Sequence, residues 1–206
     1  MAAMESQGRD INVSEARIQG YRNFATKLWN SARFGEMNEC ALPADFDENG
    51  VKHPVNRWIV AKVKEATVEL TENLDNFRFS DAANTVYQFV WGAFCDWYIE
   101  MVKPRLYNEE DTTKAAALWT LKTVLGNALK LLHPYMPFIT EEIYCTLRPE
   151  EESIMIASWP ERKAEWDFEA DEEAVEIIKE AVRSIRNVRT GMNVPPSKKA
   201  KVFVVS

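Results

Sequence analysis

Apolar residues recur at alternating steps of three and four along most of the chain, which is the period of amphipathic α-helices. Ser14 precedes the first such segment and has the side chain of an N-cap residue. Pro54 opens the second, because its fixed φ and missing N–H suit a first turn. Four long helices are expected, from Ser14 to about Met37, from Pro54 through Leu74, from Ser80–Asp81 to near Pro104 and from Asp111–Thr112 to His133.

A shorter helix and a fifth long one follow. The pattern predicts the shorter helix from Pro137 to Leu147, and it predicts the fifth from the spacing of Val175, Ile178, Val182, Ile185 and Val188. The runs Ile154–Ile156 and Lys201–Val205 have β composition, so we expect short strands near residues 153–157 and 200–205. The predicted fold class is all-α, an antiparallel up-and-down helix bundle over residues 1–147 with a small α+β extension over residues 148–206. We expect this extension to continue toward a missing C-terminal region.

The formal net charge of -7 argues against a protein that coats nucleic acid indiscriminately. Any RNA contact must therefore be local. Acidic residues gather between Glu150 and Glu173. The segment from Lys179 to Lys201 instead carries seven positive charges and the single negative charge of Glu180.

Charges interrupt every apolar run well before the roughly 20 residues that a membrane span needs, and no secretory signal opens the chain. We expect a cytoplasmic protein with no membrane partner.

No residue pattern of a catalytic or metal site is present. Cys40, Cys95 and Cys145 are widely spaced, and only His53 and His133 could accompany them, so neither a disulfide framework nor a zinc site is indicated. The sequence also lacks a glycine-rich phosphate loop, a nucleophile elbow and a His-Glu-x-x-His helix. We therefore expect no catalytic residue, no bound metal and no cofactor in this chain.

The first predicted helix interleaves basic and amide side chains with aromatic rings. Such side chains grip phosphates, read base edges and stack on unpaired bases. The pattern alone is weak evidence for RNA binding, because every amphipathic helix has a charged face. The residues concerned are Arg22, Asn23, Lys27, Asn30, Arg33 and Asn38, with Tyr21, Phe24, Trp29 and Phe34.

That helix carries the run GYRNFATKLWNSARF from Gly20 to Phe34. This run resembles the opening helix of the anticodon-binding domain of valyl-tRNA synthetases. Four further blocks resemble later parts of that domain in the same order, namely Cys95–Glu100, Leu132–Glu142, Ser158–Pro160 and Ile185–Lys199. Several of these blocks also occur in loosened form in isoleucyl- and leucyl-tRNA synthetases, but their combination is similar to the valine family.

The resemblance implies that the chain is the tRNA-binding module of a valine–tRNA ligase, with the valine tRNA, tRNA(Val), as partner. The intact parent enzyme attaches valine to this tRNA with ATP and magnesium, which belong to its catalytic domain. No catalytic activity is expected of the module. Two alternatives stay open. One is the same bundle from an isoleucyl or leucyl enzyme, and the other is a helical protein–protein interaction module.

In the family the catalytic domain precedes the bundle, so the start of the first helix is proximal and its end is distal. The resemblance therefore implies that the distal end meets the anticodon, and that Phe77–Asp81 and His133–Phe138 pack on the catalytic domain. Of the anticodon-binding candidates, only Asn30, Arg33 and Phe34 lie inside a matching block. The candidates are Asn30, Arg33, Phe34, Asn38, Phe46, Arg57, Trp58 and Lys62, with Lys179, Arg183, Arg186 and Arg189 for the tRNA backbone.

Overall fold

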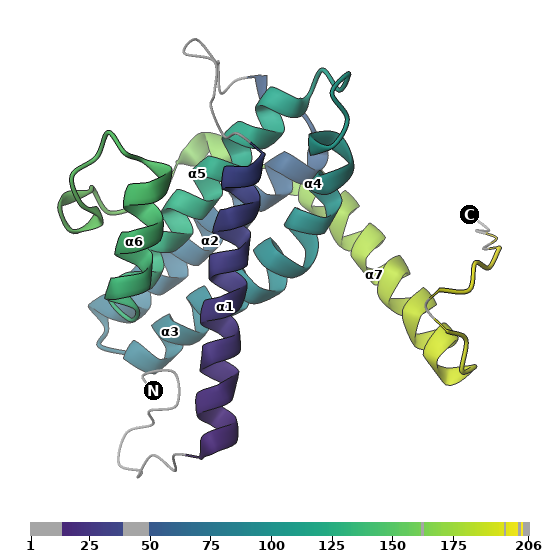
Figure 1. Ribbon diagram of the computed structural model, residues 1–206, viewed down its shortest axis with the longest axis horizontal. Helices are drawn as coiled ribbons and strands as arrows, with labels where there is room; N and C mark the ends of the chain where they lie inside the picture. Colours follow the sequence, from purple (N-terminus) through teal and green to yellow (C-terminus); the bar gives the residue numbers. More distant parts are fainter. Residues whose placement is uncertain (1–13, 39–49, 162, 196, 202, 204–206) are drawn as a thin grey trace.

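The computed structural model describes residues 14–38, 50–161, 163–195, 197–201 and 203, and all regular structure within these ranges is helical. The predicted all-α fold is therefore confirmed (Figure 1). The elements are α1 Glu15–Met37, α2 Pro54–Asp75, α3 Phe79–Gln88, η3 Phe89–Tyr98, α4 Ile99–Leu106, α5 Lys114–Leu132, α6 Pro137–Leu147, η4 Ile154–Ile156, η5 Ala164–Trp166 and α7 Glu169–Gly191.

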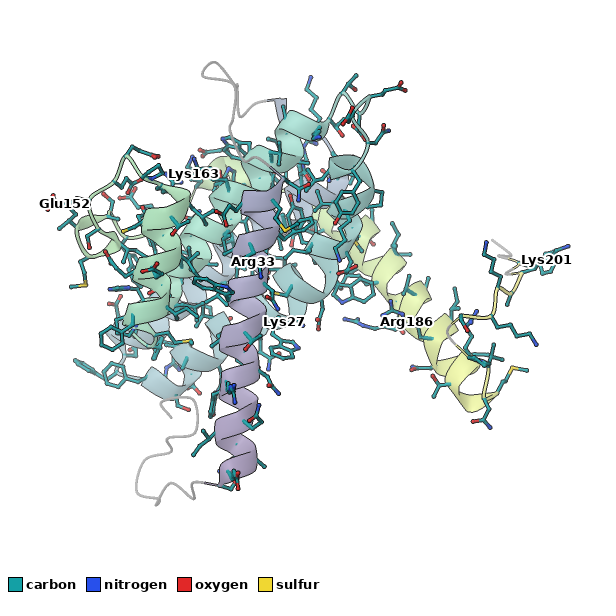
Figure 2. All side chains as sticks on the ribbon, viewed as in Figure 1. Lys27, Arg33, Glu152, Lys163, Arg186 and Lys201 are labelled. Atoms are coloured by element: carbon teal, nitrogen blue, oxygen red, sulfur yellow. The ribbon has the colours of Figure 1, made fainter. Side chains whose placement is uncertain are left out.

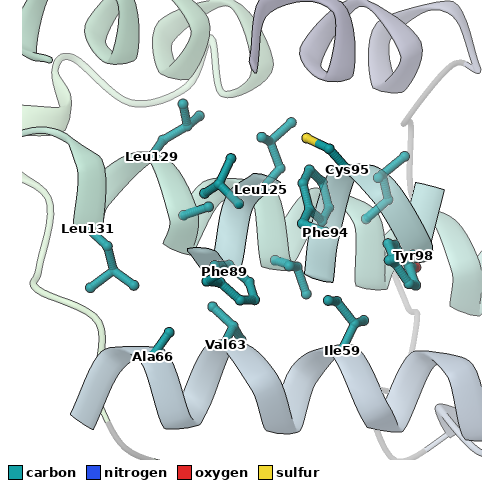
Figure 3. Packing of buried hydrophobic residues seen from close by; sticks show 14 of the residues in the cluster. Ile59, Val63, Ala66, Phe89, Phe94, Cys95, Tyr98, Leu125, Leu129 and Leu131 are labelled. Atoms are coloured by element: carbon teal, nitrogen blue, oxygen red, sulfur yellow. The ribbon is translucent and has the colours of Figure 1, made fainter. Parts of the chain in front are cut away.

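The bundle consists of α1, α2, the continuous run α3–η3–α4, and α5, which alternate in direction (Figure 1). The predicted starts of the first two helices are confirmed. Ser14 Oγ accepts a hydrogen bond from the Arg17 backbone N–H, and Pro54 occupies the first turn of α2. The core lies between α2, η3 and α5, and Figure 3 shows side chains from all three meeting there, among them Ile59, Val63, Phe94, Tyr98, Leu125 and Leu129.

The third predicted helix departs from α-helical geometry in its middle. The ten residues of η3 form a π-helix, whose wider turn brings Phe89, Phe94 and Tyr98 all into the core. The rings of Phe94 and Tyr98 stack with their centroids 5.9 Å apart. The helix also begins at Phe79 rather than after a Ser80 cap, and it continues past Pro104 to Leu106.

The predicted strand near residues 153–157 is wrong. Ile154–Ile156 forms a 3₁₀ turn, because Ser153 Oγ accepts a hydrogen bond from the Met155 backbone N–H at 3.1 Å and so favours a helical turn. Of the strand predicted near residues 200–205, residues 200, 201 and 203 are described and lie in no strand, and the others lie outside the described residues. The division into 1–147 and 148–206 stays a prediction.

Helix α7 divides into two halves with different surroundings. Its first half packs against α2, and its second half projects away from the bundle (Figure 1). The stripe predicted from residues 175–188 is therefore buried only at its start, since Val175 is buried while Ile178, Ile185 and Val188 are exposed. Within the described part of the chain, no helix has the length and apolar character that crossing a bilayer would require.

Candidate nucleic-acid interface

The end of α1 exposes two of the predicted side chains. Asn30 and Arg33 are both exposed, and no hydrogen bond or ion pair among the described residues engages either side chain. Figure 2 shows Arg33 on the outward face of α1. A guanidinium without a partner keeps all five of its donors for a ligand. These two residues form the accessible part of the predicted surface.

Phe34 and Asn38 are less available. Phe34 is half-buried, with its ring centroid 6.3 Å from that of Tyr107 and 6.0 Å from Lys103 Nζ. Asn38 Nδ2 donates to the Phe34 backbone oxygen at 2.7 Å, so its side chain caps its own helix. Phe46 lies outside the described residues. Contact between RNA and these three residues stays a prediction.

Trp29 is a candidate that the predicted set omitted. It is exposed and lies on α1 one turn before Arg33. Both residues line a hollow of about 30 Å³ between α1 and α6, whose other wall includes Ile143 and Leu147. This hollow holds little more than a water molecule, so a base would have to stack on the outer face of the indole. The signal was present in the sequence, since Trp29 lies inside the first matching block.

The structure contradicts the role predicted for Trp58. Its side chain is 0% exposed, and its indole N–H donates to Glu176 Oε1 on α7 at 3.1 Å. A ring enclosed in this way offers no face on which a base could stack. Trp58 is therefore part of the contact between α2 and α7.

Arg57 and Lys62 face the same helix and are already paired with carboxylates. Arg57 Nη1 lies 3.2 Å from Asp171 Oδ2, and Lys62 Nζ lies 2.8 Å from Glu172 Oε2. Burial by itself would lower the pKa of Lys62, but the hydrogen bonds that its ammonium donates to Glu172 and Glu65 raise that pKa above its usual value. The acidic first half of α7 thus neutralises the cations of α2, which weakens their attraction for phosphate. An RNA contact by Arg57 or Lys62 stays a prediction.

Helix α7 carries the residues predicted to contact the tRNA backbone, all but Lys179 in its second half. Lys179 does not fit this role, because it is only 7% exposed and its Nζ lies 2.6 Å from Glu176 Oε1 and 4.8 Å from the Trp58 ring centroid. Arg183 and Arg186 are exposed, with their guanidinium carbons 5.6 and 5.9 Å from the ring centroid of Trp97. Figure 2 shows Arg186 on the projecting part of α7. These two arginines lie where a phosphate could reach them.

Arg189 has a structural role at the end of α7. Its Nη2 donates to the backbone oxygens of Pro195 at 2.8 Å and Lys198 at 2.7 Å. These bonds hold the segment after the helix against it, together with Asn193, whose φ of 52° is the left-handed conformation of a helix-ending residue. A phosphate contact by Arg189 stays a prediction.

The turn between α2 and α3 and the start of α6 lie at the opposite end of the bundle from the exit of α1 (Figure 1). We call it the apolar end, and its residues are Phe77, Phe79 and Phe138, all exposed. Phe77 is 75% and Phe138 is 90% exposed. The segments predicted to pack on a catalytic domain meet here, because the Tyr135 hydroxyl donates to the Phe79 backbone oxygen at 3.1 Å.

A family model for the anticodon-binding domain of tRNA ligase matches residues 56–204. The chain belongs to this family. Curated relatives of the anticodon-binding domain include the valine–tRNA ligase of Caulobacter vibrioides, 45% identical over 210 residues, and that of Mesorhizobium japonicum, 44% identical over 211 residues. Both matches cover 100% of this chain, but only 23% and 22% of the relatives. The valine–tRNA ligase of Geobacter sulfurreducens is 45% identical over 207 residues, covering 96% of the chain and 23% of the relative. The chain thus spans about a quarter of the length of the curated relatives it matches.

Proposed function

We propose that this anticodon-binding domain binds the anticodon stem-loop of a valine tRNA, as the tRNA-holding part of a cytoplasmic valine–tRNA ligase. The relatives described above are valine–tRNA ligases, which supports the choice of valine. The observation that carries the proposal is the exposed Arg33, which has no partner among the described residues and lies beside Asn30 and Trp29. Aminoacylation, and with it ATP and magnesium, belongs in this proposal to the parent's catalytic domain. The domain by itself is expected to be catalytically inactive.

The chemistry of these side chains fits unpaired bases. A guanidinium donates two parallel hydrogen bonds to a base edge, which discriminates between bases by about 1–3 kcal/mol. A base stacked on an indole contributes roughly 1–3 kcal/mol. After the entropy of association is subtracted, two or three such contacts leave an affinity in the micromolar range or weaker. Phosphate contacts by Arg183 and Arg186 would make this affinity fall with added salt.

Arg33→Ala is expected to weaken binding of the valine tRNA anticodon stem-loop about tenfold, because it removes one bidentate base contact. The matched control is Arg22→Ala. It deletes the same charge from an exposed position about three turns earlier on α1. Fluorescence titrations at two salt concentrations measure both variants. Equal losses in the two variants would show that Arg33 supplies only general charge, and an unchanged affinity for Arg33→Ala would refute its assignment.

The identity of the tRNA is testable on the same surface. The valine anticodon ends in A-C. Exchanging its middle and third bases should therefore abolish the preference of the domain for the valine stem-loop over other stem-loops. Stronger binding to an isoleucine or leucine stem-loop would instead assign the domain to one of those enzymes. If a pull-down with this domain retains another protein independently of RNA and retains no tRNA, the result would favour a protein–protein interaction module.

We further propose that the apolar end packs on the catalytic domain of the same parent chain. Exposed apolar patches of this kind mark interaction sites. Phe77 supports this view because its φ of 56° is a left-handed conformation that a phenylalanine adopts only at a cost. The turn itself is a helix-ending motif in which the Arg78 backbone N–H donates to the Asn73 oxygen at 2.8 Å. Glycine would adopt this conformation at a lower cost in free energy. The presence of a phenylalanine here therefore reduces the local stability of the turn.

Phe77→Gly should therefore be more stable than Phe77→Ala by about 1 kcal/mol, since glycine adopts the left-handed conformation without strain. Both variants lose the ring, so their difference isolates the backbone term. Urea unfolding measures it. Equal stabilities would mean that the turn relaxes when the ring is removed, and Phe77 would then supply no evidence of a retained contact.

A further inference from the structure

His53 accepts a hydrogen bond from every backbone N–H in the first turn of α2. Pro54, the first residue of the helix, has no N–H to satisfy. The Val55 N–H donates to His53 Nδ1 at 3.2 Å. The N–H groups of Asn56 and Arg57 donate to the backbone oxygen of His53 at 2.9 and 3.1 Å. Since the first N–H groups of a helix need partners from outside it, the start of α2 depends on this one residue.

The cap that the His53 side chain provides requires one protonation state. Nδ1 can accept a hydrogen bond only while it carries no proton, so the neutral ring must hold its proton on Nε2. Protonation of the ring would place an N–H on Nδ1, directly facing the N–H of Val55. It would also place a positive charge at the N-terminus of α2, where the helix dipole is already positive. The cap is therefore intact only when His53 is neutral.

The charged groups around His53 oppose its protonation further. Burial lowers the pKa of His53 most, and the guanidinium of Arg105 on α4 lowers that pKa again. Asp111, before α5, and Asp171, on α7, act in the opposite direction with smaller effects. Hydrogen bonds from Thr113 lower the pKa of Asp111 itself, so this carboxylate stays ionised while His53 titrates. The charged neighbours on its own segment are Lys52, which is exposed, and Arg57, which is paired with Asp171.

The direction of the pH effect follows from this lowered pKa. The folded domain binds a proton at His53 more weakly than the unfolded chain does. The stability that the cap contributes is therefore complete above the pKa of the unfolded chain, and it is lost as the pH falls through the lower pKa of the folded domain.

The first turn of α2 connects this helix to two others. Asn56 Oδ1 accepts a hydrogen bond from Arg105 Nη2 on α4 at 2.7 Å, and Arg57 Nη1 lies 3.2 Å from Asp171 Oδ2 on α7. Arg57 Nε also donates to the Val51 backbone oxygen at 3.1 Å. We propose that His53 is a pH-dependent cap of α2, and that its protonation loosens the first turn together with its contacts to α4 and α7.

Nuclear magnetic resonance of the domain between about pH 8 and about pH 5 tests the proposal. At the upper end of this range, the neutral ring of His53 should carry its proton on Nε2. As the pH falls, the Val55 amide resonance should shift in step with the His53 ring. Exchange of the Val55 amide proton, corrected for the intrinsic effect of pH, should become about fivefold faster, because the loss of an N-cap has an effect of this size.

His53→Asn separates the cap from the titration, because asparagine caps a helix and carries no titratable group. In this variant the Val55 amide should stay protected over the whole pH range. The control is His133→Asn, which removes the other histidine of the chain and should leave the response of Val55 as in the unaltered domain. Three results would overturn the proposal. They are a neutral His53 protonated on Nδ1, a Val55 amide that does not respond to pH in the unaltered domain, and a response that persists in His53→Asn.

Discussion

Trp58→Ala is expected to lower the free energy of unfolding by about 4 kcal/mol, which is typical of deleting a fully buried large aromatic side chain. Trp58 is 0% exposed and lies under α7, where its indole meets Glu176 and Lys179. The substitution leaves a cavity and also removes the surface on which the first half of α7 packs. Urea unfolding followed by circular dichroism measures the loss.

Trp58→Phe serves as the control for this prediction. It keeps most of the buried ring and loses the hydrogen bond to Glu176, so a decrease of about 1–2 kcal/mol is expected. If Trp58 instead stacked on a base, Trp58→Ala would weaken binding of the stem-loop and leave the free energy of unfolding nearly unchanged. That result would restore the role predicted from the sequence.

The long helices could be predicted because the signals that define them are local. The N-cap at Ser14 and the first-turn proline at Pro54 act within one turn, and the structure confirms both. The π-helix of η3 could not be predicted, because its wider turn depends on the surrounding core. The strand predicted at Ile154–Ile156 failed because β composition needs a partner strand, whereas Ser153 caps a turn locally.

The residues of the candidate site likewise divide into those governed by local signals and those governed by contacts between distant parts of the chain. The exposure of Asn30 and Arg33 could be predicted because both lie within one amphipathic helix, and their contact with RNA stays a prediction. Trp58 and Lys179 were misassigned because α7 folds back on α2, a contact between positions more than one hundred residues apart in the sequence. The acidic stretch carried a signal that could have shown this contact. Its carboxylates match the cations of α2, as the pair Arg57–Asp171 illustrates.

Asn56→Leu is expected to lower the free energy of unfolding by about 3 kcal/mol, because it leaves a buried charge without a hydrogen-bond partner. Arg105 is buried between the helices, and its Nη2 donates to Asn56 Oδ1 at 2.7 Å. Its Nε and Nη1 have no hydrogen-bond partner among the described residues, and burial lowers the pKa of its guanidinium. Asn56 also accepts a long hydrogen bond of 3.5 Å from the Tyr98 hydroxyl.

The double variant Asn56→Leu with Arg105→Met tests the cause of this loss. Replacing both polar partners by apolar residues of similar volume is often close to neutral, so the double variant should recover most of the stability that Asn56→Leu loses. Urea unfolding of the two single variants and the double variant gives the coupling between the positions. A double variant as unstable as Asn56→Leu would show that the loss comes from misfit of leucine rather than from the stranded guanidinium.

The division of α7 into a packed half and a projecting half has a mechanical consequence. The twelve residues from Glu180 to Gly191 extend about 18 Å beyond the last buried side chain, Lys179. An α-helix of this length behaves as a stiff lever arm, so a tilt of about 10° at the packed half displaces its tip by roughly 3 Å. Small rearrangements among Asp171, Glu172 and Glu176 would thus displace Arg189, near the tip, by roughly 2–3 Å, and would displace Arg183 and Arg186, which lie closer to the packed half, by less.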